Sequence, residues 1–533
     1  MIRKLLALLC LLVPAAAQAE WYEATSPNFI VYSDGSRRDA EEYAAKLERF
    51  HYVLRTFHRI DESQAGNPLR VFLFSSVRKV RNMAGGAGVA GYYVSDARGL
   101  MFVGSRSRGG MSEGDLRSAN RAFRLDPEST MLHEYSHHFM YQYFPATYPT
   151  WYSEGFAEFW GATRLLPDDV VEVGRPAEDR VGTFQFLTWL PLDRVLTAHN
   201  YGETPGENVY SLYAQGWLLM RYAFEHPERK RQLDEYLRLI NEGATYEQAM
   251  RQAFPDLDAF NSELFNYAGS GRFNIIRLPF RTIDVGQIAV RELRPAENAL
   301  IEHEIKLSQG YPHTEAEGFA REVRSIASRY PDDPFALSVL MEAERLAGRE
   351  EAAIAAADRL LALEPDHARA MATRGHAQAA ELRKASSNDR AAWQAIQEAL
   401  ARAARLAPRD PVVLAAYYDS YAQQGVLAPV EAQNALYEAV ELAPSDGDLR
   451  YRLARDFEQR DMVPQAIAII RPRALSMPHD ESERERRERE RNAERYRPAG
   501  RETHETAREM LVRLEARLAG DTAPAQAAAR DDE

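Results

Sequence analysis

Proline recurs at a nearly constant interval through the second half of the chain, and this recurrence limits the possible fold more than any other feature. The prolines are Pro331, Pro365, Pro408, Pro444 and Pro478. The residues between them are rich in Ala, Leu, Arg and Glu, which favour helices, and each proline ends a helical run. A unit of this length cannot bury its own apolar face, so neighbouring units stack on one another. The sequence therefore predicts stacked helical repeats over residues 326–480.

The commonest interval between these prolines, about 34 residues, is typical of tetratricopeptide (TPR) repeats. Ala432, Leu436, Ala439 and Pro444 resemble the second helix of such a repeat, closed by its proline. The longer interval from Pro365 to Pro408 fits one repeat with an insertion around residues 384–390. The consensus Trp and Gly-Tyr are absent, so these are degenerate copies, and an ordinary helical bundle with coincidental prolines is the alternative. A TPR array implies a concave surface that takes a protein or peptide partner.

The first half of the chain mixes strands with helices. Residues 29–32 and 69–74 are rich in β-branched and aromatic side chains, which favours strands. Residues 39–57, between them, have the apolar spacing of a helix. Residues 92–94 and 100–103 predict a hairpin, and the pattern beyond the hairpin is mostly helical. Strands that come early and helices that come late indicate an α+β domain.

Residues 1–19 have the order of a secretory signal peptide. Arg3 and Lys4 precede an apolar run over residues 5–13, and residues 17–19 form a small-residue cleavage signal. The apolar run is too short to span a bilayer, which weighs against an N-terminal membrane anchor. Nothing later in the sequence resembles a transmembrane span. We therefore expect an exported protein, periplasmic in the first instance, with secretion as the alternative.

The amino-acid composition argues against several classes of function. The formal net charge is −13, which argues against nucleic acid as a partner because phosphate binding needs a basic face. Cys10 is the single cysteine and lies inside the signal segment. A disulfide framework and thiolate zinc fingers are therefore excluded.

The strongest chemical signal is the run His-Glu-Tyr-Ser-His, which starts at His133. It lies in a helix predicted over residues 126–144. Four residues turn a helix by about 400°, so His133 and His137 share one face and can ligate one metal ion. Glu134 beside them can take a proton from a water molecule that the metal activates. Glu154, on the next predicted helix, is the candidate third ligand, because catalytic zinc takes three protein ligands and keeps an open position.

The segment Trp-Tyr-Ser-Glu-Gly-Phe-Ala-Glu over residues 151–158 completes a resemblance to the gluzincin metallopeptidases, the thermolysin-like and aminopeptidase-like zinc enzymes. The pattern is most similar to the peptidase MA-like domains of exported bacterial proteins. The resemblance implies a zincin-like domain with one Zn²⁺ per chain, held by His133, His137 and Glu154. It also implies that Glu134 is the catalytic base.

Two further roles come from the same resemblance. Glu158, one helical turn after Glu154, would orient His133 by a hydrogen bond to its second ring nitrogen. Tyr213, in the segment Tyr-Ser-Leu-Tyr-Ala-Gln-Gly, would stabilise the developing oxyanion, with Tyr210 as the alternative. His138 points away from the ligand face and is expected to be structural.

The absence of one sequence motif favours an endopeptidase over an aminopeptidase. Aminopeptidases carry a Gly-x-Met-x-Asn segment with a neighbouring glutamate that holds the free amino terminus of the substrate. Residues 99–104 of this chain read Gly-Leu-Met-Phe-Val-Gly and have no such glutamate, which favours an endopeptidase. Residues 100–103 are instead expected to form an edge strand that pairs with an extended peptide.

Together these features predict an α+β zincin-like peptidase domain followed by an all-α TPR-like solenoid. The expected parts are a signal peptide (1–19), a peptidase domain (20–285), a connecting segment (286–325), TPR-like repeats (326–480), a charged helical segment (481–520) and a disordered tail (521–533). The predicted function is that of an exported zinc metallopeptidase whose repeats recruit a protein partner or substrate. The alternatives are a catalytically silent envelope scaffold that acts through its repeats, and a zinc hydrolase with a non-peptide substrate.

Overall fold

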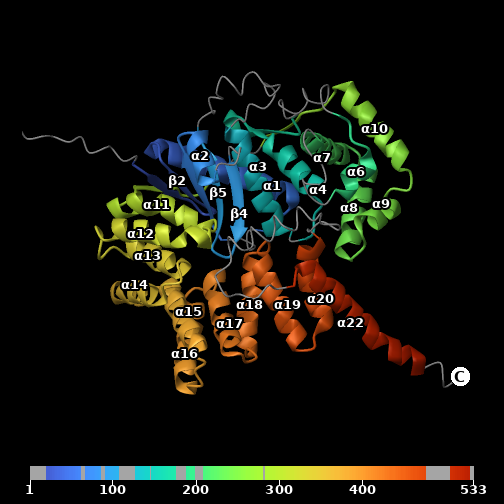
Figure 1. Cartoon of the computed structure of the whole chain (residues 1–533). Helices are drawn as coiled ribbons and strands as arrows, with labels where there is room; N and C mark the ends of the chain where they lie inside the picture. The colour runs from blue at the N-terminus through green and yellow to red at the C-terminus, as the bar shows by residue number, and fades with distance from the viewer. Residues whose placement is uncertain are drawn as a thin grey trace, which may run out of the picture.

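The protein consists of a mixed α/β half and a helical array, and the two halves lie against each other (Figure 1). This computed structural model describes residues 20–61, 67–85, 91–106, 127–144, 146–175, 188–198, 208–279, 283–475 and 505–528. The predicted signal peptide lies outside these ranges. None of the helices within them has the length and hydropathy that a bilayer span requires.

A six-stranded mixed sheet organises the α/β half. Its strands are β1 (Tyr22–Thr25), β2 (Phe29–Ser33), β3 (Leu69–Phe74), β4 (Gly91–Asp96), β5 (Gly99–Ser105) and β9 (Ala289–Glu292), in the order β4-β5-β3-β2-β1-β9. Strands β2, β3 and β5 are parallel, and the remaining pairs are antiparallel. The predicted strands and the hairpin of β4 and β5 are confirmed.

The position of the edge strand differs from the sequence prediction. Strand β5, which contains residues 100–103, pairs with β4 on one side and with β3 on the other. It is therefore an interior strand, and β4 is the edge of the described sheet at this end. The apolar run Leu-Met-Phe-Val of β5 fits this position, because a strand buried on both faces is continuously hydrophobic.

Helices cover both faces of the sheet. On one face, α1 (Arg37–His58) and α3 (Pro127–Tyr143) share a core with Phe29, Val31 and Phe102. On the other face, Phe72, Phe74 and Met101 pack against α2 (Val77–Met83) and α11 (Pro295–Ser308). The sheet is thus enclosed by the α/β half on one side and partly by the first helix of the array on the other.

The rest of the α/β half is mainly helical and extends the first core. Its helices are α4 (Thr150–Gly161), α6 (Leu192–Thr197), α7 (Asn208–Glu225), α8 (Pro227–Asn241), α9 (Tyr246–Ala253) and α10 (Leu257–Ser270). A small antiparallel sheet contains β6 (Arg164–Leu165), β7 (Val170–Val173) and β8 (Ile276–Pro279), with β7 in the middle. Helix α4 packs against both α3 and α7, and this places it at the centre of the half.

The second half is a helical repeat array, as the proline interval predicts. After α11 come α12 (Ala316–Ala327), α13 (Pro334–Leu346), α14 (Glu350–Leu363), α15 (Ala368–Lys384), α16 (Arg390–Leu406), α17 (Pro411–Gln424), α18 (Val430–Leu442), α19 (Gly447–Gln459), α20 (Val463–Leu475) and α22 (Ala507–Ala528). Consecutive helices pack against each other, and the array passes below the α/β half (Figure 1).

The turns that contain the recurrent prolines begin the first helix of each pair. The aspartates of these turns, Asp333, Asp410 and Asp446, cap α13, α17 and α19 with their side chains. The turns before α17 and α19 face the α/β half. Asn67, for example, donates a hydrogen bond of 2.8 Å to the carbonyl oxygen of Arg409. The edge of the array that carries the repeat signature is therefore the edge that docks within the molecule.

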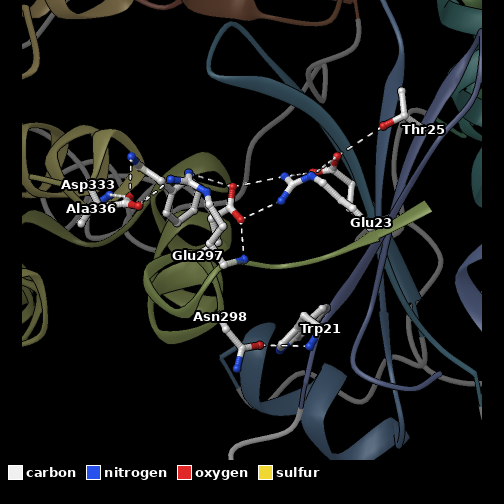
Figure 2. A network of polar contacts seen from close by, with 10 residues as sticks. Trp21, Glu23, Thr25, Glu297, Asn298, Asp333 and Ala336 are labelled. Carbon is white, nitrogen blue, oxygen red and sulfur yellow. Dashed lines mark hydrogen bonds and ion pairs between the residues drawn. The ribbon is translucent and has the colours of Figure 1, made fainter. Parts of the chain in front are cut away.

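The segment predicted to connect the halves belongs to both of them. Strand β9 pairs with β1, and α11 and α12 begin the array at residue 295 rather than at 326. Figure 2 shows the polar network at this junction, in which Glu297 accepts hydrogen bonds from Arg291 and Arg294. Arg291 also reaches Glu23 of β1, and Arg294 also reaches Asp333 of the array. One chain of ion pairs thus joins the edge of the sheet to the first helix of the array and to its first repeat.

The C-terminal region also departs from the prediction. Residues 476–504, which contain Pro478 and most of the predicted charged helix, lie outside the described ranges. Helix α22 packs on α20 and continues to Ala528, into the tail that we expected to be disordered from residue 521. The composition explains this, because alanine is the best helix former and the tail is alanine-rich.

Candidate metal centre

Helix α3 carries His133, Glu134 and His137, and the core fixes its orientation. Tyr135, between the two histidines, is 2% exposed and packs edge-on against Phe29 of β2. Its hydroxyl lies 2.5 Å from Nδ1 of His51 on α1. With this side of α3 held in the core, the histidine face is turned toward α4.

Two glycines let α4 approach its neighbours closely and so place Glu154. A Cβ atom on Gly155 would lie 2.4 Å from the carbonyl oxygen of Gly216 on α7. A Cβ atom on Gly161 would lie 3.0 Å from Cα of His133 on α3. Gly155, next to Glu154 in the sequence, therefore lies at a helix–helix contact that has no room for a side chain.

The structure brings His133, His137 and Glu154 together. Nε2 of His133 lies 3.2 Å from Nε2 of His137, and Oε2 of Glu154 lies 3.4 and 3.6 Å from these two nitrogens. Three ligands of a tetrahedral zinc ion, at bonds of about 2.0–2.1 Å, would stand about 3.3 Å apart. The triangle of donor atoms therefore has the size that one zinc ion requires, and it is the one such group found in the described ranges.

The second ring nitrogens of both histidines have partners of their own. Nδ1 of His133 lies 3.5 Å from Oε1 of Glu158, in the position that the sequence predicts for an orienting carboxylate. Nδ1 of His137 lies 3.2 Å from Oγ of Ser153, which is 3.0 Å from the hydroxyl of Tyr141. When these partners accept the Nδ1 protons, the Nε2 lone pairs of both histidines are available to bind a cation beside Glu154.

Ser153 was not predicted from the sequence. Its hydroxyl reaches His137 because of the way α3 and α4 pack together, and no local sequence pattern indicates this contact.

The electrostatics of the metal-free centre agree with this arrangement. Burial opposes a charge on His133, but Glu154, Glu158 and Glu134 outweigh it and raise the pKa of His133 to about 9. Burial also opposes a charge on Glu154, yet the two histidines hold the pKa of this carboxyl well below its usual range. The site thus attracts a positive charge strongly, whether this charge is a proton or a metal ion.

Glu134 lies between the triad and the edge of the sheet. Burial raises the pKa of its carboxyl, against the effect of His133 and His137, and a raised pKa suits a group that must accept and return a proton. The main chain of Tyr93 on β4 lies near enough to this carboxyl to oppose the rise of its pKa. The hydroxyl of Tyr93 also lies 3.0 Å from Nδ1 of His138, so the predicted structural role of His138 includes fastening β4 to α3.

The remaining predicted residue lies on α7. Tyr213 is half-buried there, on the helix that packs on α4 through Gly216. Its role at an oxyanion stays a prediction, and the side chain of its alternative, Tyr210, lies outside the described part of the chain.

Comparison with solved structures finds similarity to helical repeat proteins over about a third of the chain. No protein family model and no curated protein matches the chain. A TPR protein from Thermus thermophilus, TTC0263, is similar at 20% identity over 34% of this chain and 91% of its own, with a TM-score of 0.28. MamA from Desulfovibrio magneticus is similar at 19% identity over 35% of this chain and 97% of its own, with a TM-score of 0.26.

Proposed function

We propose that this chain is an exported zinc-dependent endopeptidase. The observation that carries the proposal is the triangle of Nε2 of His133, Nε2 of His137 and Oε2 of Glu154, with sides of 3.2, 3.4 and 3.6 Å. Glu134 stands beside this triangle. A metal-binding triad with a neighbouring carboxyl of raised pKa has the parts that metal-assisted hydrolysis requires.

Each residue of the centre has its own role in this proposal. His133, His137 and Glu154 would hold the zinc ion, which supplies Lewis acidity toward a water molecule and a carbonyl oxygen. Glu134 takes the proton of the attacking water and delivers it to the leaving amine. Glu158 and Ser153 fix the rings of the two histidines by accepting their Nδ1 protons.

The substrate we propose is an extended peptide. Strand β4 is the edge of the described sheet and packs against α3, and the main chain of its Tyr93 lies near the carboxyl of Glu134. An edge strand offers unpaired backbone groups that can pair with one more strand. A peptide paired with β4 would therefore pass directly beside Glu134.

We further propose that the array recruits the protein that is cleaved. Val426, Leu427 and Val430 support this, because they gather at one turn between α17 and α18 and are 46%, 53% and 59% exposed. Clustered exposed apolar side chains mark contact surfaces. Replacing all three with Asp should lower kcat/KM on a protein substrate and leave kcat/KM on a short peptide unchanged. An equal effect on both substrates would refute recruitment.

The first test of the function is the zinc content of the purified full-length chain, with His137→Ala as the control. We expect about one zinc per chain, lost in the control. Glu134→Gln should keep the zinc and lose turnover of a peptide library by about 100-fold or more. No zinc in the wild-type chain at neutral pH, even after zinc is added, would refute the proposal. It would leave the scaffold that acts through its repeats.

A further inference from the structure

The tip of the β4–β5 hairpin is held by the helical array. The main-chain N–H of Ala97 donates a hydrogen bond of 2.8 Å to Oδ2 of Asp446, in the turn before α19. The side chain of Ala97 packs against the apolar cluster of α17, α18 and α19. The neighbouring Arg98 accepts a bond of 3.5 Å at its carbonyl oxygen from Arg369 of α15. The tip therefore meets the array at two places that are far apart in the sequence, the turn before α19 and the first turn of α15.

The same hairpin reaches the candidate metal centre. Tyr93 precedes Asp96, the last residue of β4 before the tip of the hairpin, by three residues. This separation corresponds to about 10 Å along a strand. The hydroxyl of Tyr93 lies 3.0 Å from Nδ1 of His138 on α3, the helix that also carries Glu134 and packs against β4. On the opposite face of β4, the hydroxyl of Tyr92 donates to Oε1 of Gln309 at 2.5 Å. Strand β4 thus runs from the array to the carboxyl that we propose as the catalytic base.

We propose that Asp446 is a positioning residue for the edge strand of the active site. It acts through Ala97, so the array holds β4 at the distance from Glu134 that an incoming peptide requires. The inference rests on the proposed peptidase function, because it assigns β4 to substrate binding. It also gives the array a role within its own chain, besides any partner that it binds.

The two carboxylate oxygens of Asp446 have separate tasks, and this allows a clean test. Oδ1 caps α19 by accepting from the amides of Asp448 and Leu449, and Oδ2 accepts from Ala97. Asn is as good a helix cap as Asp. Asp446→Asn therefore keeps the cap but places an NH₂ group, which cannot accept, opposite the N–H of Ala97.

Asp333→Asn is the matched control. Oδ1 of Asp333 caps α13 in the same way, and its Oδ2 pairs with the exposed side chain of Arg294 rather than with the hairpin. The control thus makes the same chemical change in an equivalent turn of the array. Any effect of losing one carboxylate in a capping turn appears in both variants.

The experiment compares amide hydrogen exchange of the full-length, zinc-supplemented proteins. Losing a hydrogen bond to a carboxylate should speed exchange over residues 91–99 about tenfold in Asp446→Asn and leave Asp333→Asn like the wild type. For a cleaved peptide we expect KM to rise about tenfold in Asp446→Asn at unchanged kcat. Zinc content should be equal in all three proteins.

Two results would overturn the inference. Equal exchange over residues 91–99 in all three proteins would show that Asp446 does not hold the hairpin. Faster exchange with an unchanged KM would show that the hold has no effect on the substrate. Failure of the proposed function is seen separately, as a wild-type chain without zinc, and in that case the positioning role fails with it, whatever the exchange rates show.

Discussion

A methyl group added to Gly155 should damage both the stability and the metal affinity of the protein. The new Cβ would lie 2.4 Å from the carbonyl oxygen of Gly216, and ordinary contact begins near 3.4 Å. Helices α4 and α7 must therefore separate by about 1 Å to restore ordinary contact. The obstacle is backbone, which cannot rotate away, so we expect a cost of about 1–3 kcal/mol in the free energy of unfolding.

The same shift reaches the metal ligand next in the chain. Zinc sites tolerate deviations of about 0.2 Å in ligand distance, so a displacement of Glu154 by a fraction of an ångström is enough to weaken the site. We expect Gly155→Ala to lower zinc affinity at least tenfold. Urea unfolding, with and without zinc, measures the first effect, and competition with a chromophoric chelator measures the second.

A glycine without such a neighbour supplies the control. Gly318 lies in α12, and a Cβ atom there would meet nothing within 4 Å. Gly318→Ala should be neutral or stabilise the protein by up to about 1 kcal/mol, because alanine is the better helix former. If Gly155→Ala behaves like Gly318→Ala in both assays, the close approach of α4 and α7 does not position Glu154.

Three further predictions concern the metal centre and the junction of the halves. Glu158→Gln and Ser153→Ala should each lower zinc affinity about 10–100-fold in chelator competition without removing a ligand; wild-type affinity in both would exclude them as orienting groups. Because the pKa of His133 is raised from 6.5 to about 9, metal-free protein should hold stability below pH 6.5 that it loses as the pH rises through 9. Urea unfolding in a chelator, against His133→Asn, measures this as a difference that shrinks with rising pH, and a constant difference would contradict it. A chain cut after residue 285 should be largely insoluble, because it loses Ile301 and Ile305, which are 3% and 0% exposed against the sheet; a chain cut after residue 310 should stay soluble to a greater extent in the same expression test.

Local patterns predicted the elements that carry their own signal. The strands over 29–32 and 69–74 are visible because β-branched and aromatic residues gather in them, and the hairpin because its two apolar runs flank a short turn. His133, Glu134 and His137 could be placed on one helical turn because the helix period alone decides it. The array could be predicted because its proline signal recurs along the second half of the chain.

Features that depend on distant parts of the chain could not be predicted. Strand β9 is short and mostly exposed, and its partner β1 is the first strand within the described residues. The two strands are therefore far apart in the sequence, and no local pattern indicates that they pair. The apolar run of β5 is compatible with an interior strand, but the order in which β3, β4 and β5 pair is a property of the whole sheet. The orienting role of Ser153 likewise depends on how α3 and α4 cross, which their separate sequences do not contain.

The docking of one edge of the array has a consequence for how the protein can change in evolution. The turns before α17 and α19 contact the α/β half, so their lengths are constrained by it. Turns at the other edge of the array join the two helices of each pair. The extra residues of the longest proline interval, from Pro365 to Pro408, lie at that edge. Helices α15 and α16 have 17 residues each, against 12 to 14 residues for the others from α11 to α20, and they project beyond their neighbours (Figure 1). Insertions and fused tags should therefore be tolerated at residues 385–389, whereas a single residue added beside Asp446 would disturb a centre on the far side of the sheet.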